Sequence, residues 1–215
     1  FEHVDLDVGL QKKLVELDRQ MLEECQRRFT ISETTTQRLE RFNGVRADPL
    51  YHPPRLAGRL RSGPYGNYVL SVGRLESIKR VDLLLKAMPD VDASLRLLVV
   101  GEGTQREHFE AVAEECGLNG RVEFVGRVGD ETLLELYAGA LAVAFVPYDE
   151  DYGLVTLEAF LARKPVVTAS DSGGTLEFVE DGVTGVVCVP EADAVADALN
   201  RLVADRGLAA SLGEA

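Results

Sequence analysis

The most constraining feature of this sequence is a regular alternation of apolar strands and helical stretches that begins at residue 68. Apolar runs of strand length lie at 68–72, 95–100, 122–125, 140–146, 165–168 and 186–189. Helical stretches lie near 79–88, 104–116, 130–139, 153–163, 174–180 and 191–204. Strands that are apolar throughout must be covered on both faces, so the alternation predicts a doubly wound, Rossmann-like α/β domain with a parallel sheet. Such a sheet binds ligands beyond the carboxyl ends of its strands.

The part of the chain before this alternation predicts a helix over 10–28, a short strand over 29–31 and a helix that begins at the N-cap Ser32. A segment rich in proline, glycine and arginine follows and predicts an interdomain linker. The chain opens at Phe1 rather than Met, and we expect it to be part of a longer protein. The expected division is 1–52 as the tail end of an N-terminal domain, 53–66 as the linker and 67–215 as the C-terminal domain.

The overall charge and the cysteines exclude several classes of function. The formal net charge is −13, and no basic face that could bind nucleic acid is apparent. No apolar run approaches the ~20 residues that span a bilayer. Three cysteines lie far apart, which argues against a disulfide framework or a zinc site and favours a reducing cytoplasm.

The loop after the first strand carries two cations. Arg74 follows the strand directly after Gly73, and Lys79 lies at the start of the next helix. An arginine fork and a lysine charge can together hold a phosphate group. The alternative is a solvated basic turn, but a lysine at a helix N-terminus opposes the helix dipole, and an anion would remove that conflict.

The loop after the fourth strand is the richest in polar groups. A buried strand ends at Pro147, an acidic stretch follows, and a helix is expected to start near Gly153. Free amides at the helix start could bind an anion, contributed by Tyr152, Gly153, Leu154 and Val155. Glu150 and Glu158 could accept hydrogen bonds from sugar hydroxyls. In the alternative interpretation, Glu150 only complements the helix dipole and Glu158 lies on the solvated surface of the helix.

Other loop motifs each allow more than one interpretation. Residues 101–106 nearly spell a dinucleotide-binding fingerprint, although a tight turn explains them as well, and Thr104 with Glu107 predicts a capping box. Asp149 and Asp151 form an Asp-x-Asp pattern that could hold a divalent cation. Gly173 and Gly174 allow close backbone approach or a flexible turn.

With these motifs in place, the sequence resembles the C-terminal domain of the family-4 retaining glycosyltransferases. The matching stretches are VGRLESIKRVDLLLKA, VVGEGTQREHFEAVAEECGL, VEFVGRV, EDYGLVTLEAFLARKPVV and SGGTLEFVEDGVTGVV. The resemblance implies the GT-B fold of two facing Rossmann-like domains, with this chain as the C-terminal half and a remnant of the N-terminal domain. It also implies a nucleotide-diphospho-sugar donor, no metal and no cofactor.

The resemblance further implies roles for single residues. Arg74 and Lys79, after Gly73, would hold the donor diphosphate, and Glu150 would face the transferred sugar; these three are the expected catalytic residues. Glu158 would bind the ribose hydroxyls. The remaining expected contacts come from Asp151, Tyr152, Gly153, Leu154 and Val155 for sugar and phosphate, and from Gly126, Arg127 and Val128 for the base.

The sequence departs from the commonest family motif at two places. One is Arg80, where glycine is frequent, and the other is the run Thr175-Leu176-Glu177. Both variants resemble a branch of bacterial mannosyltransferases of polysaccharide biosynthesis, so the donor is expected to be GDP-mannose or a UDP-sugar. The acceptor, a glycan or lipid-linked sugar, would bind the missing N-terminal domain. That domain would also make any peripheral contact with the inner face of the cell membrane, and without it we expect no transferase activity.

The sequence is also compatible with three alternative functions. The chain could be a metal-dependent sugar transferase that uses Asp149 and Asp151, or a nicotinamide-binding domain built around residues 101–106. It could also be a non-catalytic domain that only binds a nucleotide-sugar.

Overall fold

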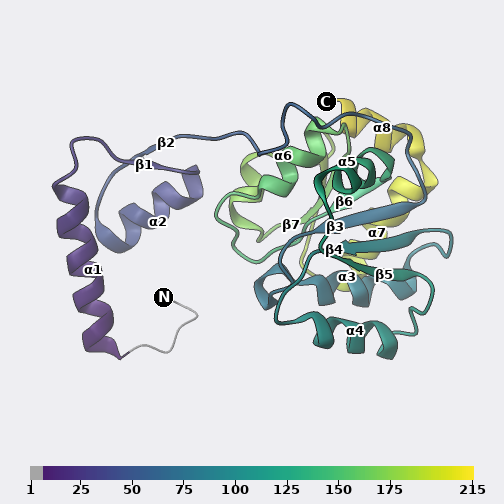
Figure 1. Cartoon of the computed structure of the whole chain (residues 1–215), viewed down its shortest axis with the longest axis horizontal. Helices are drawn as coiled ribbons and strands as arrows, with labels where there is room; N and C mark the ends of the chain where they lie inside the picture. The colour runs from purple at the N-terminus through teal and green to yellow at the C-terminus, as the bar shows by residue number, and fades with distance from the viewer. Residues whose placement is uncertain (1–6) are drawn as a thin grey trace. The chain divides into compact units, whose positions relative to one another are not determined.

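The computed structural model describes residues 7–215, so the first six residues of the predicted segment 1–52 lie outside it. The chain divides into two compact units between His52 and Pro53 (Figure 1). Each unit is described by itself. No helix of residues 7–215 is both long and apolar enough to cross a membrane.

The first unit contains two helices and a small parallel sheet. Helix α1 spans Val8–Glu23, and α2 spans Glu33–Asn43. Strands β1, Phe29–Thr30, and β2, Asp48–Pro49, pair in parallel. The predicted N-cap is confirmed, because Ser32 Oγ accepts a hydrogen bond from the Thr35 amide at 3.0 Å. The first helix is shorter than predicted, since it ends at Glu23 rather than near residue 28.

The second unit is built on a parallel sheet of six strands in the order β5-β4-β3-β6-β7-β8. The strands are β3 Tyr68–Val72, β4 Arg96–Val100, β5 Val122–Gly126, β6 Ala142–Ala144, β7 Val166–Ala169 and β8 Gly185–Cys188. Every strand that the alternation predicted is present within a few residues. The doubly wound parallel sheet is therefore confirmed.

Helices fill the connections between the strands. They are η1 Ser77–Lys79, α3 Val81–Ala87, η2 Met88–Asp90, α4 Arg106–Glu115, α5 Asp130–Gly139, α6 Leu154–Leu161, η3 Gly173–Glu177, α7 Ala192–Ala204 and α8 Arg206–Glu214. Three differ from expectation. The predicted helix 79–88 is divided, and Lys79 ends the 3-10 turn η1 while α3 begins only at Val81, so Lys79 does not lie in the first turn of an α-helix, where its charge was expected to oppose the dipole. The predicted helix 174–180 is only a 3-10 turn, and α8 was not predicted at all. Asp205 caps α8 by accepting a hydrogen bond from the Leu208 amide at 2.9 Å.

Two apolar layers cover the sheet, one on each face. One layer packs α3, α4, α7 and α8 against the strands through fully buried side chains such as Leu85, Phe109 and Leu199. The other packs α5 and α6 through Tyr137 and Ala159. Figure 1 shows α5 and α6 on one side of the sheet and α3 and α4 on the other. Burial on both faces explains why the strands are mostly apolar.

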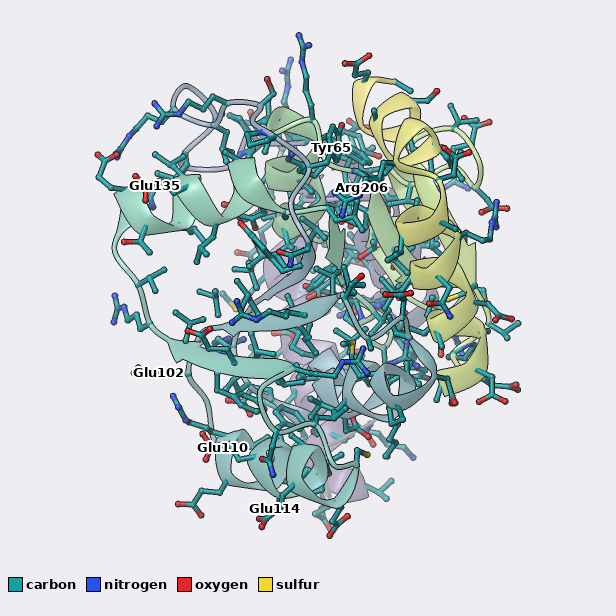
Figure 2. The ribbon with its side chains drawn as sticks, turned by 90° about the vertical axis from the view of Figure 1, so that its right-hand side faces the viewer. Tyr65, Glu102, Glu110, Glu114, Glu135 and Arg206 are labelled. Atoms are coloured by element: carbon teal, nitrogen blue, oxygen red, sulfur yellow. The ribbon has the colours of Figure 1, made fainter. Side chains whose placement is uncertain are left out.

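The segment 53–66 belongs to the second unit. Leu56 is buried in it, and Lys164 Nζ donates hydrogen bonds to the Gly63 and Pro64 carbonyls at 2.9 and 3.3 Å. Arg206 donates to the Tyr65 carbonyl at 2.6 Å, and Figure 2 shows the two residues side by side. The role of segment 53–66 as a linker between domains stays a prediction.

Candidate functional site

The candidate site lies where the order of the sheet reverses direction. From β3 the chain proceeds outward to β4 and β5, then returns to β6 on the other side of β3. The carboxyl ends of β3 and β6 are therefore neighbours, and their loops diverge and leave a crevice between them. Arg74 and Lys79 come from the first loop, and Glu150 comes from the second.

Lys79 and Glu150 form an ion pair across this switch point. Lys79 Nζ contacts Glu150 Oε2, and the two side chains are 17% and 18% exposed. The ammonium also lies 5.5 Å from the centre of the Phe145 ring, on the strand end between them. The sequence predicted both residues in one site but not their direct contact, because they are 71 positions apart.

Arg74 is the exposed cation of the site. Among residues 7–215 its guanidinium has no ion pair or hydrogen bond. It lines a small pocket at the carboxyl ends of β3 and β4 with Gly73, Leu75, Lys79 and Phe145. The arrangement places one available cation and one paired cation around a hollow that could receive an anionic group.

Helix α6 begins beside the acidic loop. Gly153 is its N-cap, in the left-handed conformation at φ 80°, and Leu154 is the first helical residue. The amides in the first turn of a helix have no partner within the helix, and the dipole favours an anion there. Gly153 is also tightly packed, since a Cβ would lie 2.8 Å from the Thr175 hydroxyl oxygen. Glycine is thus required by backbone conformation and by space.

Glu158, in the second turn of α6, is held by a residue that the sequence reasoning missed. The Tyr137 hydroxyl donates a hydrogen bond to Glu158 Oε2 at 2.7 Å. Burial raises the pKa of Glu158, while the hydrogen bond from Tyr137 and the charge of Arg55 lower it. Burial and the adjacent carboxylate raise the pKa of Tyr137 well above its usual value. A buried tyrosine needs a hydrogen-bond partner, but the sequence does not reveal which one.

The expected base-binding loop lies at the end of β5. Gly126 ends the strand at φ 76°, Arg127 is exposed, and α5 starts at Asp130. Arg55, from the segment 53–66, holds Asp130 through two hydrogen bonds of 2.8 and 2.7 Å. No described contact joins Gly126, Arg127 or Val128 to the Lys79–Glu150 pair, so their role stays a prediction.

The glycine-rich turn after β4 is explained by packing of one loop on another. A Cβ on Gly101 would lie 1.9 Å from the Gly73 carbonyl oxygen, and one on Gly103 would lie 2.3 Å from that of Leu75. The predicted capping box is wrong: α4 begins at Arg106, and Thr104 Oγ1 instead donates to Glu76 at 3.0 Å. This turn therefore buttresses the loop that carries Arg74.

The paired glycines after β7 serve the acidic loop in the same way. A Cβ on Gly173 would lie 2.5 Å from the Glu150 carbonyl oxygen, and one on Gly174 would lie 2.4 Å from that of Asp151. The Gly174 amide donates to the Glu150 carbonyl at 2.7 Å. The flexible-turn interpretation is wrong, because these glycines are needed where two loops touch.

Several acidic side chains of α4, α5 and the loop after β4 lie at the surface of the second unit. Glu102, Glu110, Glu114 and Glu135 are exposed and point outward in Figure 2. In the described part of the chain, no group of three or more His, Cys, Asp or Glu side chains could hold a metal ion. Asp149 and Asp151 thus gain no third ligand of these types there.

The chain matches a family of glycosyltransferases and curated relatives of it. The sequence profile described as glycosyl transferases group 1 matches residues 59–215. A D-inositol 3-phosphate glycosyltransferase of Nocardia farcinica is 32% identical over 95% of this chain and 49% of its own length. A glycogen synthase of Mycobacterium tuberculosis is 38% identical over 73% of this chain and 38% of its own length.

Solved structures share the fold. HepE of Anabaena, in complex with UDP, superposes with a TM-score of 0.86 over 99% of this chain and 62% of its own, at 21% identity. The curated relatives named above are at least twice as long as the stretch they match, so the chain spans about half of their length or less.

Proposed function

The chain belongs to the glycosyl transferases of group 1, with the fold of the C-terminal domain of GT-B enzymes, and from this premise we propose that it binds a nucleotide-diphospho-sugar donor. The observation that carries the proposal is the placement of Arg74 and Lys79 around one pocket at the carboxyl ends of β3 and β4, with Lys79 paired to Glu150 across the switch point. In the whole protein this domain would serve hexosyl transfer to a glycan or lipid-linked acceptor.

The proposed binding mode assigns the diphosphate to the cations. Arg74 is exposed and lines the pocket, so its fork would bind the phosphate oxygens first. Lys79 would exchange Glu150 for a phosphate, which would free the Glu150 carboxylate to face the sugar. Glycosyl transfer builds negative charge on the leaving diphosphate, and fixed cations with a helix N-terminus would stabilise that charge.

The remaining assignments follow from position. Glu158 has one oxygen occupied by Tyr137, and its other oxygen would accept from the ribose hydroxyls. The base would lie at Gly126, Arg127 and Val128. A UDP-sugar or GDP-mannose is proposed as donor; the UDP bound to HepE supports the former. Metal independence, retention of configuration and a role in polysaccharide biosynthesis are proposed from family membership.

The acceptor site and any membrane contact are proposed to lie in the part of the longer relatives that this chain does not match. We also propose a cytoplasmic location, at the inner face of the cell membrane where the whole protein makes peripheral contact. Transfer would then need both parts, whereas donor binding would need this chain alone.

The test is a calorimetric binding panel of UDP, GDP and ADP and their sugars against this chain, with and without EDTA. Binding of UDP or GDP that survives EDTA is expected. Binding that disappears in EDTA would favour a metal at Asp149 and Asp151, and binding of NADH instead would favour an oxidoreductase domain. No binding of any nucleoside diphosphate would refute the proposal.

A matched pair of variants locates the binding. Arg74→Ala is expected to weaken nucleoside diphosphate binding by about 2 kcal/mol, the scale of a charged hydrogen bond. Arg96→Ala removes the same charge at the opposite end of the sheet, where Arg96 pairs with Glu123 at 2.6 Å, and should leave binding unchanged. Equal affinities for the two variants would contradict the role of Arg74.

A further inference from the structure

Arg80, the residue after Lys79, has an unusual backbone and a fully engaged side chain. Its φ of 49° lies in the left-handed region, where a residue other than glycine is strained. Its Nε donates to the Val146 carbonyl at 2.8 Å, and its Nη2 donates to the Pro147 carbonyl at 2.9 Å. The guanidinium thus binds the backbone at the point where the chain leaves β6 for the acidic loop.

The same guanidinium binds Asp171 on a third loop. Nη1 lies 2.8 Å from Asp171 Oδ2, and Nη2 lies 2.6 Å from Oδ1, so the pair is bidentate. The side chains of Arg80 and Asp171 are 20% and 33% exposed. The Asp171 carbonyl in turn accepts from the Asp149 amide at 2.9 Å, next to Glu150 in the chain.

Backbone contacts complete the connection. The Tyr148 amide donates to the Ile78 carbonyl at 2.8 Å, so the acidic loop is tied to the residue before Lys79. Asp149 has a φ of 47°, a left-handed conformation that the bonds on both sides of it maintain. The loops after β3, β6 and β7 therefore meet at one clamp, formed by Arg80 and Asp171.

We propose that this clamp positions Lys79 and Glu150 for the donor diphosphate and its sugar. The inference rests on the proposed function and deepens it. Arg80 sits directly beside Lys79, and Asp171 holds the amide directly before Glu150, so each end of the clamp fixes one member of the ion pair. Arg80 and Asp171 are positioning residues, because their polar side-chain atoms are hydrogen-bonded to each other and to the backbone. Glycine would fit the backbone of position 80 without strain, which leaves the side-chain contacts as the reason for arginine.

The test compares two variants with opposite effects on charge. Arg80→Gly removes a positive charge and relaxes the backbone, whereas Asp171→Asn removes a negative charge at nearly constant shape. If charge alone mattered, the first would weaken UDP binding and the second would strengthen it. The clamp predicts that both weaken it, by roughly tenfold, the scale of coupling between neighbouring sites. Arg80→Lys, which keeps the charge but loses the fork, should also weaken UDP binding.

The matching monophosphate separates positioning from general damage. UMP lacks the terminal phosphate, so its affinity should fall much less than that of UDP in each variant; GDP and GMP serve if the unaltered chain prefers guanine. Arg96→Ala is the charge control and should change neither affinity. Tighter UDP binding by Asp171→Asn, unchanged binding by Arg80→Gly, or equal losses for UDP and UMP would each overturn the proposal.

A ligand-free measurement keeps this inference distinct from the proposed function. Hydrogen exchange at the Tyr148 and Asp149 amides should accelerate in Arg80→Gly and in Asp171→Asn, while exchange at the β4 core amides stays unchanged. If the unaltered chain binds no nucleotide, the proposed function fails on its own account. Unchanged exchange at these two amides would overturn the clamp even if UDP binds.

Discussion

Removal of one oxygen, by Tyr137→Phe, tests how Glu158 is held. Tyr137 is fully buried, and its hydroxyl lies 2.7 Å from Glu158 Oε2. Phenylalanine has the same ring, so the variant leaves no cavity and keeps the apolar contacts of α5. Only the hydrogen bond to the carboxylate is lost.

The expected loss of stability follows from that bond. A hydrogen bond to a charged group contributes about 1.5–3 kcal/mol, and the lower end applies because Glu158 keeps some contact with solvent. A loss of about 1.5 kcal/mol corresponds to a fall in Tm of roughly 3–6 °C for a chain of this size. Tyr68→Phe is the matched control, since its hydroxyl donates to the neutral Leu136 carbonyl at 2.8 Å, and it should cost less.

The contribution of Glu158 to the free energy of unfolding changes with pH in a definite direction. Burial raises the pKa of Glu158 above 4.5, so the folded protein holds this proton to a higher pH than the unfolded chain does. The free energy of unfolding therefore falls as pH rises from 4.5 through the raised pKa. The Tyr137 hydrogen bond opposes the shift, so its removal should raise the pKa further and steepen the fall. Urea denaturation across this interval measures the slope.

The nucleotide affinities of Tyr137→Phe distinguish a ribose-binding role of Glu158 from a general loss of structure. A Glu158 carboxylate that is no longer held should bind UDP about threefold to tenfold more weakly, with a smaller change for 2′,3′-dideoxyuridine diphosphate. Tyr68→Phe should change neither. Equal losses for the two nucleotides in Tyr137→Phe, or no loss for UDP, would refute the assignment of Glu158 to the ribose.

Two further perturbations test the packing around the site and the segment at its other end. Gly103→Ala places a Cβ 2.3 Å from the Leu75 carbonyl oxygen and should lower both Tm and UDP affinity, whereas Gly129→Ala, which meets no atom within 4 Å, should leave both nearly unchanged. Similar melting temperatures for the two variants would contradict the loop-on-loop packing. Burial lowers the pKa of Lys164 to about 8, so the unfolded chain binds this proton more tightly and its contribution makes stability rise with pH above about 8. Lys164→Met should remove that rise in urea denaturation at alkaline pH; an unchanged profile would show that Lys164 is not the group responsible.

The fold could be predicted from the sequence because its signals are local and repeated. The core strands are mostly apolar, and the stretches between them have helical spacing, so the order of the elements follows from the pattern of apolar residues along the chain. Prediction failed where a tertiary contact overrode a local preference. Thr104 and Glu107 have capping-box spacing, but the Thr104 hydroxyl bonds to Glu76 on the neighbouring loop. Helix α8 was missed because it is short and contains two glycines, Gly207 and Gly213, which lower its intrinsic helix propensity.

The candidate site was predictable in part for the same reason. The strands of a parallel sheet end at the same edge, so Arg74, Lys79 and Glu150, which lie in loops that follow strands, could be assigned to that edge. The bonds that fix these side chains could not, because their partners are distant in sequence. Tyr137 and Glu158 are 21 positions apart, and Arg80 and Asp171 are 91 apart. Spacing along the chain carries no information about such pairs.

The attachment of segment 53–66 to the second unit has a practical consequence for domain exchange between relatives. A junction at residue 67 would remove the Gly63 and Pro64 carbonyls and leave the Lys164 ammonium buried without these acceptors. It would also remove Leu56 from the core. A chimaera joined between His52 and Pro53 keeps these contacts within one parent, so the specificity of a transplanted donor half can be compared without the loss of these contacts.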